Sequence, residues 1–166
     1  MYLKQKDVFW AMDKDFVKEI MNIAESESYQ EGDVLFQEGD HADNFYILLK
    51  GRVKLILGQT GRVVHVVSNA GETFGWSSLV GRDTYSASAK CVVSAKLLKF
   101  ERQKLQKVVA KDPANGMVFF KRIAGILGNR LLRSYAMIAS APSADVSTSF
   151  GTGQVIDITA TELERM

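Results

Sequence analysis

The feature of this chain that most restricts its fold is a series of short turns that contain glycine. Most of these glycines lie 7 to 12 residues apart, and the segments between them are apolar. The turns are Glu31-Gly32-Asp33, Glu38-Gly39-Asp40, Lys50-Gly51-Arg52, 58–61 and Ala70-Gly71-Glu72. Glycine suits such positions because it accepts a positive φ without a Cβ clash. The spacing is typical of a compact all-β sandwich or barrel.

The segments between the turns have the composition of strands. They cover 34–36, 45–49, 53–57 and 63–67. Within 53–57, alternate residues share one face by the period of two that strands have. A later apolar run, 87–100, is long enough for two strands. We therefore expect the middle of the chain to be a mainly β domain.

Helical spacing flanks this β region on both sides. The first helix can be capped by Asp13, and its apolar positions are Phe16, Ile20, Met21 and Ile23. After Phe100 a second helix places Leu105, Val108 and Val109 on one side. Asp112 and Pro113 then mark the start of another helix, because proline is tolerated at the first helical position.

This last helix is long and has two apolar faces. One face is a stripe near heptad spacing, formed by Met117, Phe120, Ala124, Leu127, Leu131, Tyr135 and Ile138. Phe119, Ile123 and Ile126 add a second face. Ala124 and Gly128 are small and four residues apart, which permits close approach of another helix. One face can cover the β domain, and we expect the other to form a homodimer, with Phe120, Ala124, Leu127, Gly128 and Leu131 in the contact.

Composition restricts the function further. The net charge is only +2, with a single cysteine and two histidines, His41 and His65. Neither histidine has a partner at ligand spacing, so no metal site, no cofactor and no enzyme activity are expected. No window reaches the roughly 18 apolar residues of a membrane span, and the N-terminus lacks a secretory segment. We expect a cytoplasmic protein that contacts no membrane.

The order of turns and strands carries a resemblance to a known family. The segment 30–40, followed by Phe45-Tyr46-Ile47-Leu48 and Lys50-Gly51-Arg52-Val53, resembles the first half of cyclic nucleotide-binding domains. More narrowly, residues 10–138 are similar to the sensor half of the catabolite-activator and fumarate–nitrate-regulator family. The resemblance implies a jelly-roll β-roll, a cupin-like double-stranded β-helix, with an N-terminal helix and a long C-terminal dimerisation helix.

The resemblance also places a phosphate-binding cassette between the later strands. In the family, backbone N–H groups of a one-turn helix hold the cyclic phosphate, a glutamate binds the ribose and an arginine pairs with the phosphate. The matching residues in this chain are Phe74, Gly75, Trp76, Ser77, Ser78, Tyr85, Ser86 and Ala87. Ser134 and Tyr135 lie on the long helix where the family's lid reaches over the base.

The cassette departs from the family pattern at both ionic positions. Trp76 stands where the glutamate is expected, and Tyr85 where the arginine is expected. Each lost charge-assisted contact costs about 1.5–3 kcal/mol, so losing both is expected to weaken a micromolar ligand such as cyclic AMP to near millimolar. Trp76 can stack on a flat ligand or fill the nucleotide's space. Ser77 can bind an anion or simply cap the turn.

Several functions stay open at this stage. The chain is a regulatory domain that senses a small, anionic, nucleotide-like ligand, or a ligand-independent dimerisation and interaction module. A transcriptional regulator lacking its DNA-binding domain is a third interpretation. We divide the chain into 1–138, the β-roll with its helix, and 139–166, a flexible tail with linker composition over 140–154 and a short strand from Val155. Only 28 residues follow Ile138, so direct DNA binding by this chain is not expected.

Overall fold

The computed structural model describes residues 8–58, 61–140, 148–150 and 154–156. Contacts divide the chain into two units, Met1–Gly125 and Ile126–Met166. The first unit contains the sheet, and the second contains the later part of the long helix and a hairpin.

Two long antiparallel strands form the centre of the first unit. β3 (Asn44–Leu57) pairs with β6 (Ser88–Glu101) from Asn44↔Glu101 to Ile56↔Ser88. β1 (Ala24–Tyr29) pairs with the other edge of β6, and β4 (Arg62–Val67) with the other edge of β3. The short strands β2 (Val34–Phe36) and β5 (Thr73–Phe74) pair with β6 and β3, respectively. The mainly β prediction is therefore confirmed.

The structure corrects three details of the predicted strands. The run 87–100 forms one strand, β6, rather than two. The turn at Gly51 is a bend inside the continuous strand β3, where φ is +102° and the pairing with β6 shifts register. β1 was not predicted, because its sequence, Ala-Glu-Ser-Glu-Ser-Tyr, lacks the apolar alternation of a strand. It pairs with β6 and places mostly polar side chains at the surface.

Aromatic side chains fill the interior of the roll. Phe36 stacks on Tyr85 with ring centroids 3.7 Å apart, and Tyr46 stacks on Phe74 at 5.1 Å. These rings belong to one buried cluster that extends to aliphatic residues of β3 and β6, including Leu48, Val53 and Leu97. The cluster holds both halves of the bent sheet together, since burial of large aromatic side chains dominates core energetics.

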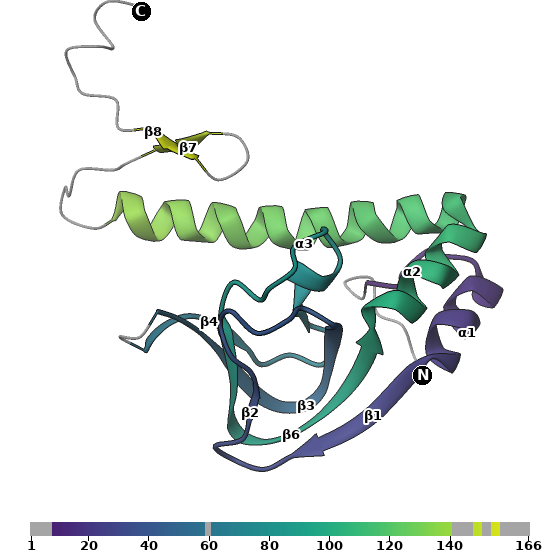
Figure 1. Cartoon of the computed structure of the whole chain (residues 1–166), viewed down its shortest axis with the longest axis horizontal. Helices are drawn as coiled ribbons and strands as arrows, with labels where there is room; N and C mark the ends of the chain where they lie inside the picture. The colour runs from purple at the N-terminus through teal and green to yellow at the C-terminus, as the bar shows by residue number, and fades with distance from the viewer. Residues whose placement is uncertain (1–7, 59–60, 141–147, 151–153, 157–166) are drawn as a thin grey trace, which may run out of the picture. The chain divides into compact units, whose positions relative to one another are not determined.

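The described residues include three α-helices, and their predicted starts are confirmed. α1 (Lys14–Asn22) is capped by Asp13, whose carboxylate accepts a hydrogen bond from the Asp15 N–H at 2.8 Å. α2 (Arg102–Lys111) directly follows β6 and contacts α1 (Figure 1). α3 (Pro113–Ala139) begins at the predicted proline. Asp112 precedes it and accepts a hydrogen bond from the Asn115 N–H at 3.0 Å.

The two faces of α3 have different environments. Phe119 and Ile123 are buried, and the Phe119 ring contacts Phe9 and Phe45 of the first unit. Along the stripe predicted for the dimer, Met117 is 58% exposed and Leu131 is 50% exposed. The face of Phe119 and Ile123 therefore covers the core, and the dimer stripe contains large apolar side chains that reach solvent.

The second unit contains a small hairpin. β8 (Gln154–Ile156) confirms a short strand near Val155, and it pairs antiparallel with β7 (Thr148–Phe150). β7 was not predicted, because it lies in the segment 140–154 whose composition indicates a linker. Within the predicted tail, residues 141–147, 151–153 and 157–166 lie outside the described residues. None of the helices within the described ranges has the length and apolarity needed to span a membrane.

Candidate functional site

The cassette begins at a turn that only glycine can form. Gly75 has φ +75° and precedes the short 3-10 helix η1 (Trp76–Ser78). A Cβ at Gly75 would lie 2.8 Å from the Asn44 carbonyl oxygen and 3.1 Å from Cδ2 of Tyr46. Because this space is already occupied by β3, the turn packs directly against the sheet. Phe74, just before it, is fully buried and fixes the turn to the core.

The two serines of η1 are both buried, and Ser77 does not have the capping role suggested for it. The cap position is Gly75, and no side chain caps the turn. It is the Ser78 hydroxyl that bonds the turn's backbone, donating to the Gly75 carbonyl at 2.8 Å. Ser77 is 2% exposed, and Trp76 is half-buried. The short helix is thus held from inside, with the tryptophan at its start.

Tyr85, which we predicted to stand at the arginine position of the family, points into the core and is 4% exposed. Its hydroxyl donates to the Asn44 carbonyl at 2.8 Å and accepts from the Asn44 N–H at 3.0 Å. Burial raises the pKa of this phenol, so it stays neutral at any physiological pH. The side chain therefore fastens the end of the cassette to the beginning of β3. Ser86 and Ala87, which follow it, are half-buried.

The loop before Tyr85 is held by backbone hydrogen bonds to the turn at residues 39–42. The Tyr85 N–H donates to the Asp40 carbonyl at 2.9 Å, and the Tyr85 carbonyl accepts from the Gly39 N–H at 3.0 Å. Arg102 adds a contact from α2, since its Nη1 donates to the Arg82 carbonyl at 3.1 Å. The cassette loop is consequently tied to both the sheet and α2.

Two charged residues near the cassette serve the local backbone or face solvent. The Glu72 carboxylate accepts hydrogen bonds from the N–H groups of Ser68 and Asn69, at 2.7 and 2.8 Å, and closes the turn before β5. Arg82 has an exposed side chain. The Glu72 carboxylate is thus engaged by the backbone of its own turn, and the Arg82 side chain faces solvent.

The predicted lid and dimer residues lie on α3. Ser134 donates a hydrogen bond to the Arg130 carbonyl of its own helix at 3.1 Å, and Tyr135 is 55% exposed. Both belong to the second unit, so their role over the cassette stays a prediction. The same holds for the dimer contact at Phe120, Ala124, Leu127, Gly128 and Leu131.

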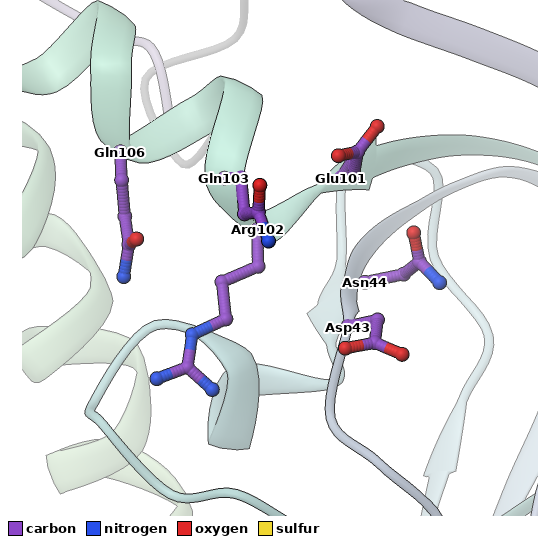
Figure 2. A pocket seen from close by; sticks show the side chains of 6 residues that line it. All are labelled: Asp43, Asn44, Glu101, Arg102, Gln103 and Gln106. Carbon is purple, nitrogen blue, oxygen red and sulfur yellow. The ribbon is translucent and has the colours of Figure 1, made fainter.

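A cavity of about 600 Å³ lies elsewhere in the first unit, beside the start of α2. The residues that line it all have polar or charged side chains, namely Asp43, Asn44, Glu101, Arg102, Gln103 and Gln106 (Figure 2). Sequence reasoning missed this site. Its residues come from two distant segments that the β3–β6 pairing brings together at Asn44↔Glu101, and neither segment contains a motif that signals binding.

Comparison with known proteins identifies the family. Residues 26–112, more than half of the chain, match the model of the cyclic nucleotide-binding domain. The cyclic nucleotide-gated channel beta-3 of Homo sapiens is 26% identical over 128 residues, which cover 75% of this chain and 16% of the channel. A cGMP-dependent protein kinase of Drosophila melanogaster is 28% identical over 94 residues, 54% of this chain and 10% of the kinase. The chain thus spans only a small part of these curated relatives.

Solved structures share the fold. A cyclic nucleotide-binding domain from Methylobacillus flagellatus superimposes with a TM-score of 0.74, at 22% identity over 83% of this chain and 79% of that domain. The catabolite activator protein of Thermus thermophilus gives a TM-score of 0.65, at 23% identity over 80% of this chain and 61% of the activator. With its family match, its β-roll and its long C-terminal helix, this chain belongs to the cyclic nucleotide-binding domain family.

Proposed function

We propose that this chain is a non-catalytic regulatory domain whose cassette does not bind cyclic AMP or cyclic GMP with ordinary affinity. The observation that carries the proposal is the position of Tyr85. Its neutral, buried hydroxyl is used by the Asn44 backbone, at the place where the family has an arginine for the phosphate. A phosphate placed there would lose its counter-charge.

The glutamate position supports the same conclusion. Trp76 cannot accept the hydrogen bonds that a carboxylate would accept from a ribose hydroxyl, since its indole is only a donor. Two lost charge-assisted contacts together cost about 3–6 kcal/mol. This loss would raise a micromolar dissociation constant by two orders of magnitude or more.

Isothermal titration of the full chain with cyclic AMP and with cyclic GMP tests this part of the proposal. We expect dissociation constants near 1 mM or weaker for both nucleotides. A dissociation constant below about 10 μM, equivalent to roughly −7 kcal/mol, would show that other groups replace the two anchors and would overturn the proposal.

We further propose that the domain acts as a homodimer through the stripe on α3. The proposal is supported by the large apolar side chains that α3 exposes, including Leu131 and Tyr135, because exposed apolar patches of this kind mark interaction sites. In sedimentation velocity at about 100 μM, a concentration at which a dimer with a micromolar dissociation constant is mostly formed, the wild type should be a dimer. The control variant Asn129→Glu, whose change lies off the stripe, should also be a dimer. Leu131→Glu should be monomeric. A monomeric wild type would refute the dimer.

The second candidate function is a ligand-independent interaction module. It is favoured by the same contact of Tyr85 with Asn44, because this hydrogen bond fixes the cassette end without any ligand. The two candidates differ in the effect of small molecules on the dimer. A ligand-sensing domain changes its sedimentation or stability when a small anion is added, whereas an interaction module does not.

A further inference from the structure

The polar cavity beside α2 has two walls, which come from segments far apart in the sequence. Asp43 and Asn44 come from the segment that starts β3, while Arg102, Gln103 and Gln106 come from the first turns of α2. Glu101 joins the walls at the end of β6. Figure 2 shows the side chains of Asn44 and Asp43 on one side and those of Arg102 and Gln106 reaching from the helix on the other.

The Asp43 carboxylate and the Arg102 guanidinium both line this cavity and do not form an ion pair with each other. The ion pairs within the described ranges are Lys99 with Glu25 and Glu27, Lys104 with Glu25 and Glu101, and Lys111 with Glu19. None of them includes Asp43 or Arg102. Glu101, by contrast, is already neutralised by Lys104 at 2.8 Å. The cavity therefore presents one available carboxylate and one available guanidinium.

Local hydrogen bonds hold these two charges apart. The Arg102 N–H donates to the Asp43 carbonyl at 2.7 Å, so the backbones are adjacent. The Arg102 side chain, however, extends to the cassette loop and donates from Nη1 to the Arg82 carbonyl at 3.1 Å. A guanidinium has five N–H donors, so most of them stay available for a ligand after this single bond.

We propose that this cavity binds a small polar zwitterion, namely an α-amino acid or a short peptide with free termini. Asp43 would receive the ammonium group and Arg102 the carboxylate, each as a charge-assisted hydrogen bond. The amides of Asn44, Gln103 and Gln106 supply donors and acceptors for the polar body between the two charges. The mostly polar lining disfavours a hydrophobic ligand, and a volume of about 600 Å³ accommodates up to a short peptide.

The position of Arg102 gives binding a structural consequence. The same guanidinium contacts the cassette loop at Arg82, so a carboxylate bound to its remaining N–H groups alters a group that touches this loop. Binding is expected to change the environment of both the cavity and residues 82–85. This change provides a readout that does not depend on cyclic nucleotides, so the site is tested independently of the proposed function.

NMR titration of the ¹⁵N-labelled full chain tests the proposal. L-glutamine and glycyl-L-glutamine, added to about 20 mM (roughly −2.3 kcal/mol), distinguish a free amino acid from a short peptide. At least one should shift the amide signals of Asn44, Arg102 and Gln103. N-acetyl-L-glutamine lacks the ammonium and L-glutamine amide lacks the carboxylate, and each should bind at least about tenfold more weakly.

Variants of the full chain test whether the charges of Asp43 and Arg102 bind the ligand. Asp43→Asn should weaken binding about tenfold or more, and Arg102→Gln should do the same. Glu31→Gln and Arg52→Gln change exposed charges outside the cavity and should bind as the wild type does. The proposal is overturned if neither compound shifts these amides, if the blocked compounds bind equally well, or if Asp43→Asn keeps wild-type affinity. The blocked compounds test the wild-type protein even where a variant does not fold.

Discussion

Replacing Gly51 by alanine should destabilise the domain strongly. Gly51 bends β3 at φ +102°, a region that costs a residue with a Cβ about 1–3 kcal/mol. A Cβ there would also lie 2.4 Å from the Ser94 carbonyl oxygen and 2.6 Å from the Ala95 Cα. These are backbone atoms of β6 and cannot rotate away, so the overlap adds about 1–3 kcal/mol. The expected loss is about 2–6 kcal/mol of unfolding free energy.

Gly39→Ala is the control that carries the conformational cost without the steric overlap, so the difference between the two variants measures the steric part. Gly39 has a similar φ of +91°, but a Cβ there would meet no atom within 4 Å. We therefore expect only the conformational cost, about 1–3 kcal/mol. Urea denaturation of the wild type and both variants, followed by tryptophan fluorescence and circular dichroism, measures the difference. With a slope of about 2 kcal/mol/M, an extra 2 kcal/mol lowers the urea midpoint by about 1 M.

The comparison of the two variants decides the argument. If Gly51→Ala and Gly39→Ala cost the same within about 0.5 kcal/mol, which is near the resolution of the method, then the close approach of β3 and β6 at Gly51 contributes nothing. The bend would then be set by φ alone. If Gly51→Ala costs more but leaves the slope unchanged, the loss lies in the native state, as the contact with Ser94 and Ala95 requires.

Further predictions concern the cassette, the core and the surface. Tyr85→Phe should lower the unfolding free energy by about 1–3 kcal/mol in urea, because two partly buried backbone groups lose their partner, whereas Tyr135→Phe should change it by less than about 0.5 kcal/mol. Phe119→Ala should lower the unfolding free energy by about 3–5 kcal/mol in the same assay, since the Phe119 ring is fully buried. A loss of less than about 1 kcal/mol would contradict this prediction. Burial raises the pKa of Glu27, but hydrogen bonds from Lys99 and Tyr29 lower it by more, so the net pKa lies below the usual value. Its stabilisation is thus present above about pH 4.3 and lost as the pH falls further, and Glu27→Gln should cost up to about 1 kcal/mol at pH 7 and nothing near pH 2. An equal cost at both pH values would contradict the role of charge.

The sequence was sufficient for the fold because the turns are marked by glycine. Gly32, Gly39, Gly51, Gly71 and Gly75 all adopt positive φ, and this backbone conformation is what their spacing signals. The helix starts at Asp13 and Pro113 followed from capping rules in the same way. Signals of this kind depend on the backbone conformation at a single position, so they could be read without the structure.

The strand boundaries and the polar cavity required the structure. β1 escaped detection because a polar edge strand is stabilised by pairing with β6, and its own sequence shows no period of two. The cavity depends on the register Asn44↔Glu101, which no local pattern encodes. The direction of Tyr85 was also hidden, because the sequence shows an aromatic residue at an arginine position but not that its hydroxyl bonds Asn44.

The central position of β6 has a consequence for how the chain folds. β1, β2 and β3 all pair with β6, although they precede it by tens of residues. During synthesis, these strands leave the ribosome without their partner, and the sheet can close only after residue 101 has emerged. Long-range pairing of this kind slows folding to milliseconds or longer, and unpaired strand edges promote aggregation meanwhile. We therefore expect chains truncated before Ser88 to be insoluble, while chains that include Glu101 begin to acquire protection from proteases.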